Sequence, residues 1–342
     1  RPAAVQHRTS CRRPAPYATI LKTIQSAVTE TPLIMVGSGA SAPHGLPSMH
    51  DLGKHLVHQL SACYRGTPCW DNFEANIAND DDLETALTGI ELTREVLADI
   101  RCETWNLISS RDLAVYEQLL FSPKMLPLTR LLKKFYQAHP RRIDIITTNY
   151  DRLIEYACDL AEIPCTVGFD GYYLKHFSGS FADKNSVNLL KVHGSLDVFR
   201  DVHGGIVSAP MLSNLPTGLI PEIITPGSSK YAAILHGTHR ELLLAADERI
   251  KRARSFLCIG YGFNDSQIQE GIITRIRAGI PIVSITQKVS DSAAHLLVNN
   301  AQHYITIQQD EIPDKTAVCI DNHIEILDGT FWTIDGFMSL ID

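Results

Sequence analysis

Short apolar segments, each ending in glycine or small polar residues and followed by a stretch suited to a helix, constrain the fold of this chain most strongly. The clearest is Leu33–Val36, which runs directly into glycine, serine and alanine at 37–41. Similar segments lie at 143–146, 189–192, 255–259 and 281–286. Buried strands that alternate with helices are typical of a parallel sheet covered on both faces. The sequence therefore predicts an α/β fold with a doubly wound parallel sheet.

Polar or glycine-rich residues follow five of the predicted strands, at 37–41, 147–151, 193–195, 225–227 and 260–265. Because the carboxyl ends of parallel strands meet at one edge of a sheet, we expect these segments to line one crevice. The small residues at 37–41 would let backbone N–H groups approach a pyrophosphate at a helix N-terminus. A tight turn from strand to helix also needs glycine, so this segment alone does not establish a nucleotide site.

The region 51–142 has few strand signals and is predicted to be an all-helical insertion that caps the crevice. Helix-like stretches lie at 51–60, 82–100, 111–121 and 126–138. The short acidic side chains at 79–82 are suited to begin the second of these helices, because they accept hydrogen bonds from its first N–H groups.

Composition excludes several classes of protein. The chain has 342 residues, of which 44% are hydrophobic, so it can bury a core. A net charge of −7 argues against direct nucleic-acid binding, and no apolar run reaches the ~20 residues of a membrane span. Eight cysteines without a CxxC pair favour free thiols in the cytoplasm. We expect no metal site, because the histidines at 44, 50, 55 and 58 lack acidic or cysteine partners at suitable spacing.

Several motifs occur in the order found in one enzyme family. Residues 37–47 read Gly-Ser-Gly-Ala-Ser-Ala-Pro-His-Gly-Leu-Pro and resemble the sirtuin signature, glycine–x–glycine–x–serine followed by glycine–isoleucine/leucine–proline. Thr147-Thr148-Asn149-Tyr150-Asp151 is similar to the sirtuin segment with a central asparagine. His193-Gly194 resembles the catalytic histidine-glycine, and 260–263 resembles the later glycine-containing loop near the adenosine ribose. The resemblance covers residues 31–50 and 143–290.

The departures from that family point to one branch of it. Sirtuin deacylases carry a four-cysteine zinc ribbon, for which this chain has no candidate, and Met49-His50 replaces their aromatic–arginine pair. The chain therefore resembles the sirtuin-like NAD hydrolases of prokaryotic antiphage defence more than the deacylases. Members of that branch break NAD+ into nicotinamide and ADP-ribose when infection is sensed.

The resemblance implies a Rossmann-like NAD-binding domain formed by 31–50 and 143–310, with NAD+ as substrate. Asn149 would position water or the ribose, and His193 would be the general base toward the ribose hydroxyls. An amide donates and accepts without titrating, and an imidazole with a pKa near ~6.5 takes up a proton near neutral pH. Contacts with NAD+ are implied for Gly37, Ser38, Gly39, Ala40, Ser41, Leu46, Pro47, Thr148, Asp151, Gly260, Tyr261, Gly262, Phe263 and Thr286.

Some of these residues have simpler structural interpretations. Asn149 could cap a plain turn. Asp151 could cap the helix that follows it, and Asn264 and Asp265 could cap the helix after 265. For Asp151 the alternative is to hold the nicotinamide carboxamide or to support the loop.

The two ends of the chain carry less information. Residues 1–30 are expected to form a flexible leader and a short helix; 1–16 is basic and proline-rich, and a basic arm that contacts a partner is the alternative. Residues 311–342 are expected to form a tail with short strands at 318–320, 324–327 and 331–334, which packs on the core or forms an interface.

The resemblance also implies how the protein is activated. We expect a homo-oligomer, with a possible partner nucleoside triphosphatase or other activating protein. Two other functions remain open: an NAD-dependent protein deacylase or ADP-ribosyltransferase, and a non-enzymatic scaffold that binds NAD or ADP-ribose. The missing zinc ribbon counts against the first, and the presence of Asn149 and His193 counts against the second.

Overall fold

The computed structural model describes residues 17–79, 83–87, 89–122, 126–226 and 237–342. The predicted leader at 1–16 and most of the predicted helix start at 79–82 lie outside this part of the chain. Asn79, which is described, ends a helix and does not begin one.

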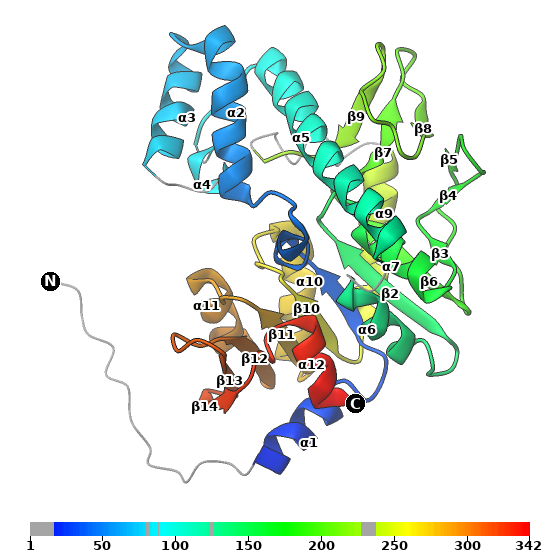
Figure 1. The fold of residues 1–342 in the computed structure, drawn as a ribbon, viewed down its shortest axis with the longest axis vertical. Helices are drawn as coiled ribbons and strands as arrows, with labels where there is room; N and C mark the ends of the chain where they lie inside the picture. The colour runs from blue at the N-terminus through cyan, green and yellow to red at the C-terminus, as the bar shows by residue number, and fades with distance from the viewer. Residues whose placement is uncertain (1–16, 80–82, 88, 123–125, 227–236) are drawn as a thin grey trace, which may run out of the picture.

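The described residues form a central sheet of nine strands in the order β14-β13-β12-β11-β10-β1-β2-β6-β3 (Figure 1). Strands from β12 to β3 in this order are parallel, and β13 and β14 are antiparallel to their neighbours. The strands are β1 (Leu33–Val36), β2 (Arg142–Thr147), β3 (Cys165–Thr166), β6 (Ser186–Lys191), β10 (Phe256–Ile259), β11 (Ile282–Thr286), β12 (Tyr304–Gln309), β13 (Lys315–Ile320) and β14 (His323–Asp328). The predicted α/β fold with a largely parallel sheet is confirmed.

Strand order reverses beside β1. The chain runs outward from β1 through β2 to β6, and then returns to add β10 on the other side of β1 and continues to β12. Every residue of β1 and β10 is buried, which explains why both read as uninterrupted apolar runs. The junction between them is the point where an open α/β sheet leaves a crevice beyond its carboxyl ends.

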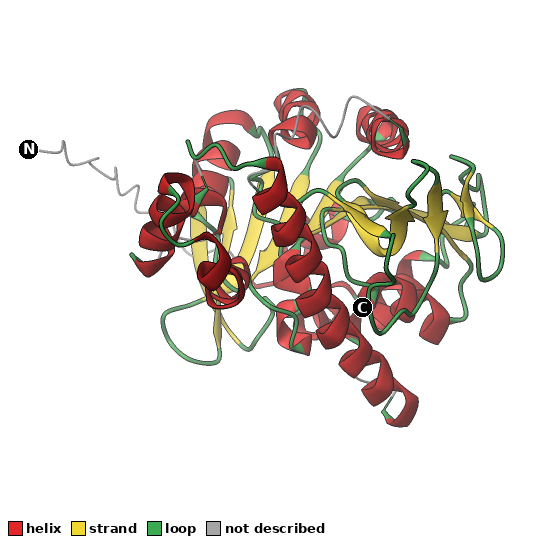
Figure 2. Cartoon of the chain, turned by 90° about the horizontal axis from the view of Figure 1, so that it is seen from above, coloured by secondary structure: helices red, strands yellow, loops and turns green. Residues whose placement is uncertain are grey.

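Helices cover both faces of the sheet (Figure 2). Ile34 and Val36 point into one hydrophobic core, and Leu33 and Met35 into the other, as the alternation of a strand requires. The first core includes helices α1 (Tyr17–Ala27), α6 (Pro127–Phe135), α7 (Leu153–Ala161) and α12 (Ile334–Ile341). The second includes α9 (Thr238–Arg252), α10 (Ser266–Arg277) and α11 (Asp291–Asn300).

A helical group with its own hydrophobic core lies beyond one end of the sheet (Figure 1). It comprises α2 (Met49–Tyr64), α3 (Pro68–Ala78), α4 (Leu83–Ala86) and the first part of α5 (Arg94–Phe121). The second part of α5 packs on the sheet domain, where the Trp105 indole N–H donates to the Leu196 carbonyl at 2.9 Å. Helix α5 therefore belongs to both cores.

Two predicted helices in this region were wrong in their limits. The stretch 82–100 is not one helix, because α4 ends at Ala86 and Thr93 begins α5, accepting a hydrogen bond from the Val96 N–H at 3.3 Å. The predicted helix 111–121 is the second part of α5, and α3 was not predicted.

Smaller strands lie beside the main sheet. Strands β7 (Gly194–Arg200), β8 (Ile206–Ser208) and β9 (Ile220–Ile223) form an antiparallel sheet, and β4 (Phe169–Asp170) pairs with β5 (His176–Phe177). The hairpin predicted at 202–210 is confirmed, since β7 and β8 pair around Gly204, whose φ is +83°.

The last segment corrects one prediction. Residues 331–334 were predicted as a short strand, but 331–333 form a turn and Ile334 begins α12. Thr333 caps this helix by accepting the Gly336 N–H at 3.0 Å. Phe337 and Met338 are buried against the first core. Within the described part of the chain, none of the helices has the length and apolar character needed to cross a membrane.

Candidate active site

The loops after β1 and β10 pack backbone against backbone. A Cβ atom on Gly37 would lie 2.4 Å from the Gly260 carbonyl oxygen, and the Gly39 N–H donates to that same oxygen at 3.1 Å. Gly260 itself has a φ of +54°. Glycine is therefore required here by the contact between the two loops, whether or not a pyrophosphate is also bound.

A cavity of about 140 Å³ lies at this edge of the sheet. Most of the predicted site residues line it: Gly37, Ser38, Ser41, Leu46, Pro47, Thr148, Asn149, Asp151, His193, Tyr261, Gly262 and Phe263. Gly39, Ala40, Gly260 and Thr286 do not. Met49 on helix α2 and Ile108 on helix α5 also line the cavity, so the helical region contributes directly to it.

Asn149 is held in one orientation by its amide group. Its Nδ2 donates to the Gly37 carbonyl at 3.0 Å and to the Ser41 hydroxyl at 3.1 Å. Because a carbonyl can only accept, the atom that faces Gly37 must be the nitrogen. The amide oxygen is then the acceptor that Asn149 offers to a water or a hydroxyl group.

Asp151 joins the first loop to the second. The Ser41 hydroxyl donates to Asp151 Oδ2 at 2.8 Å, and the Leu153 N–H donates to Oδ1 at 3.2 Å. Burial raises the pKa of Asp151 to about 6, although Lys191 and the Ser41 hydroxyl act to lower it. Both carboxylate oxygens are engaged by the protein, so the contacts favour a supporting role for Asp151.

His193 is paired with Asp265, a residue of the predicted crevice for which the sequence suggested a helix cap. Its Nε2 lies 2.6 Å from Asp265 Oδ2, and the two side chains are 14% and 4% exposed. Asp265 also caps α10, because its Oδ1 accepts the Gln267 N–H at 2.9 Å. A carboxylate on Nε2 favours the tautomer with a proton there and leaves the lone pair on Nδ1.

The backbone after His193 is fixed by the contact between β7 and β9. A Cβ on Gly194, whose φ is +90°, would lie 2.0 Å from the Glu222 carbonyl oxygen. The Ile224 N–H donates to the His193 carbonyl at 2.8 Å. Glycine at 194 therefore lets the strand turn directly behind the imidazole.

A buried lysine supports the loop that carries Asn149. Lys191 Nζ donates to the Tyr150 carbonyl at 3.2 Å, to the Asp151 carbonyl, and to Glu155 Oε1 at 2.8 Å. Its side chain is only 5% exposed. The ammonium group thus neutralises two carbonyl dipoles and one carboxylate beneath the loop.

Sequence reasoning missed Lys191 altogether and missed the second role of Asp265. Lys191 ends an apolar strand, at a position where a charged residue is unusual and signals a buried partner. Asp265 follows a glycine-containing loop and begins a helix, so its sequence context indicated only a cap.

No group of three or more histidine, cysteine or acidic side chains that could hold a metal ion occurs among the described residues.

Comparison with protein families gives a match to the sequence of this chain. The profile of the SIR2-like domain matches residues 144–325. No curated protein sequence matches this chain.

Solved structures give weaker similarities. A structure from a study of the mechanism and regulation of Sir2 enzymes is 14% identical, covers 80% of this chain and 88% of its own, and has a TM-score of 0.44. A Sir2 homologue in complex with NAD is 16% identical, with coverages of 84% and 87% and a TM-score of 0.40. A Sir2 homologue mutant in complex with ADP-ribose is 18% identical, with coverages of 81% and 87% and a TM-score of 0.44.

Proposed function

The chain belongs to the SIR2-like domain family, and on this premise we propose that it hydrolyses NAD+ to nicotinamide and ADP-ribose. The observation that carries the proposal is that Asn149 and His193, from strands that follow one another in the sheet, line one cavity. Asp265 supports His193 from a third segment. An amide, an imidazole and a carboxylate in one crevice are suited to the cleavage of a glycosidic bond.

The reaction requires little acid catalysis. The bond between nicotinamide and C1′ of the ribose breaks with its electron pair going to the nicotinamide, which leaves as a neutral molecule. Positive charge develops on the ribose, and water adds at C1′ while it loses a proton. What the protein must supply is a fixed geometry and a base near the ribose hydroxyls or the water.

His193 is suited to be that base. With its Nε2 bound to the Asp265 carboxylate, its Nδ1 can take up the proton, and the carboxylate stabilises the imidazolium that forms. The oxygen of Asn149 is suited to accept a hydrogen bond from the water or from a ribose hydroxyl, because the nitrogen is held by Gly37 and Ser41. Asp151 then keeps the loop of Asn149 in place through Ser41.

The cavity must widen for a whole dinucleotide to bind. At about 140 Å³ it is smaller than typical ligand pockets, which are roughly 300–1,000 Å³. Met49 and Ile108 lie at its wall on helices α2 and α5. We infer that movement of these helices relative to the sheet admits NAD+.

We further propose that the hydrolase is an abortive-infection effector of antiphage defence, which depletes NAD+ in the cytoplasm. The support is the absence of a candidate zinc ribbon in the sequence and the presence of Met49-His50 in place of the aromatic–arginine pair of deacylases. Assembly into a homo-oligomer, or binding of an activating protein such as a nucleoside triphosphatase, would switch the activity on. Measuring NAD+ cleavage across size-exclusion fractions, with and without the products of neighbouring genes, tests this part.

The central experiment is to incubate the purified chain with NAD+ alone and to measure nicotinamide and ADP-ribose. Equal amounts of both products without a peptide support hydrolysis, whereas turnover only with an acyl-peptide would indicate a deacylase. Asn149→Ala and His193→Ala should abolish product formation, and His203→Ala, at an exposed turn, should leave it unchanged. Unaltered product formation in either of the first two variants would refute the role assigned to that residue.

A further inference from the structure

A second cavity, of about 350 Å³, lies behind the loops of the candidate active site. Adjacent residues of the chain face the two cavities. Asp151 lines the first and Arg152 the second, and His193 lines the first while Gly194 lines the second. The volume lies at the lower end of the roughly 300–1,000 Å³ of small-molecule sites, so the occupant must be small.

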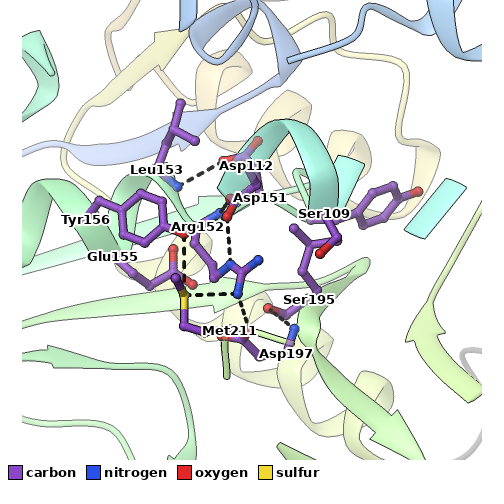
Figure 3. A network of polar contacts seen from close by, with 12 residues as sticks. Ser109, Asp112, Asp151, Arg152, Leu153, Glu155, Tyr156, Ser195, Asp197 and Met211 are labelled. Atoms are coloured by element: carbon purple, nitrogen blue, oxygen red, sulfur yellow. Dashed lines mark hydrogen bonds and ion pairs between the residues drawn. The ribbon is translucent and has the colours of Figure 1, made fainter. Parts of the chain in front are cut away.

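Two ion pairs lie in its wall, and Figure 3 shows the contacts of Arg152, which belongs to one of them. Arg152 Nη1 lies 3.0 Å from Asp197 Oδ1, and its Nε lies 2.9 Å from Asp112 Oδ2, on helix α5. Lys191 pairs with Glu155 at 2.8 Å. The ion pairs therefore fix the positions of the charged groups in this cavity, which is the condition for selecting a ligand by charge.

In both lining pairs the carboxylate faces outward. The side chains of Glu155 and Asp197 are 22% and 19% exposed, whereas those of Lys191 and Arg152 are 5% and 3% exposed. An incoming molecule thus meets the acidic side chains before it meets the cations. Burial raises the pKa of Asp197, although Arg152 and Lys191 act to lower it, so the neighbouring cations do not fully offset the burial of this carboxylate.

The formal charge of the lining is also negative. Its carboxylates are Glu155, Asp159, Asp197 and Glu222, and its lysines and arginines are Arg152, Lys175 and Lys191. Within the described residues, Glu155 Oε2 has no hydrogen-bond partner, although Oε1 of the same group is bound to Lys191, and Arg152 Nη2 and His239 Nδ1 of the same lining have none either. The lining therefore has one acidic side chain more than it has lysine and arginine side chains, and of these acids Glu222 is already bound by Arg200, outside the lining, and by His239. The carboxylates left for a ligand are those of Glu155, Asp159 and Asp197.

Three aromatic rings also line this cavity, beside the charged side chains. Tyr116 and Tyr156 both line the cavity, and their ring centroids are 5.4 Å apart. Phe169, in strand β4, also lines the cavity. Faces of aromatic rings attract cations and also bury apolar groups. Carboxylates and aromatic rings together are the lining expected for an organic cation.

We propose that this cavity binds a small organic cation, in which a primary amine or guanidinium group meets Glu155, Asp159 and Asp197 and an apolar body packs on Tyr116 and Tyr156. The proposal is independent of NAD+ hydrolysis. The second cavity is connected to the candidate active site through Lys191, which binds both Glu155 and the carbonyls of the Asn149 loop.

Titration calorimetry of the full chain with benzylamine and benzyl alcohol tests the proposal, because the two probes have similar shapes and differ in charge. We expect benzylamine to bind one site per chain with a Kd on the order of 1 mM or tighter, and benzyl alcohol to bind roughly tenfold more weakly. Asp159→Asn, at an exposed position on the rim, and Glu155→Gln should each weaken benzylamine binding about three- to tenfold.

Glu162→Gln is the matched control. Glu162 is exposed and directly follows α7, the helix that carries Glu155 and Asp159, and it does not line the cavity. Its Kd for benzylamine should equal that of the unaltered chain. Three results would overturn the proposal: no binding of benzylamine, equal binding of the two probes, or an unchanged Kd in both Asp159→Asn and Glu155→Gln. Weakening by Asn149→Ala in place of these variants would put the amine in the first cavity and would also overturn it.

Discussion

The imidazole of His193, between β6 and β7, lies 2.6 Å from the carboxylate of Asp265, at the start of α10, so two segments about seventy residues apart meet at one hydrogen bond. This pair predicts that Asp265→Asn lowers kcat for NAD+ cleavage by about 100-fold, because the charge that stabilises the imidazolium is lost.

A test of the pair must separate catalysis from folding. Asn at 265 retains an oxygen that can cap α10, so the urea midpoint should change little while kcat falls. The double variant with His193→Ala should be no slower than His193→Ala alone, since residues that act as a unit are not additive. Additive losses in the double variant would contradict the pairing.

Asp151 predicts a pH dependence of stability. Its pKa is raised from 3.8 to about 6, so between these values the folded protein holds a proton that the unfolded chain has released. The free energy of unfolding should therefore fall as the pH rises through this window, by about 3 kcal/mol from this group.

Urea unfolding of the unaltered chain and of Asp151→Asn, at intervals from about pH 4 to about pH 7, measures this contribution. The advantage of the unaltered chain over the variant should shrink as the pH rises, because Asn carries no proton to lose. Other buried carboxylates are common to both proteins and cancel in the difference. Parallel curves would show that Asp151 titrates normally.

Gly37 is predicted to tolerate no side chain. Gly37→Ala places a Cβ 2.4 Å from the Gly260 carbonyl and 2.7 Å from Tyr261 Cα, so the backbone must move, at a cost of about 1–3 kcal/mol. NAD+ turnover should fall together with the melting temperature. Gly262→Ala is the control in the same site, since its Cβ would meet only the Asn264 side chain at 3.4 Å. Equal melting temperatures for the two variants would contradict the close packing.

Lys191 is predicted to be among the more sensitive buried positions. Lys191→Met leaves the Glu155 carboxylate without its cation and two carbonyls without their donor, which should destabilise the fold by about 3–5 kcal/mol. The double variant Lys191→Met with Glu155→Leu should recover part of this loss, because no unpaired charge is left. Chemical denaturation of the four proteins gives the coupling energy directly.

The strands and loops of the site were predictable from the sequence because each is local. Leu33–Val36 and the strand at 256–259 are wholly apolar, and a parallel sheet brings their carboxyl ends together whatever the loops contain. The family resemblance then named Asn149 and His193, which the structure places in one cavity.

The contacts that depend on tertiary packing could not be read in this way. Nothing near Asp265 in the sequence indicates His193, because their contact depends on the sheet bringing the segments that follow β10 and β6 together. The limits of α5 were wrong because its 28 residues change partners along their length, from the core of α2–α4 to the sheet domain, and so carry no single periodic face.

That change of partners gives α5 a mechanical consequence. Ile108 of this helix touches the first cavity, and one turn later Asp112 holds Arg152 at the second. A continuous helix cannot tilt over one of these positions without displacing the other. A protein that binds at α2–α4 and tilts α5 would consequently change the walls of both cavities together, without contacting Ile108 or Asp112.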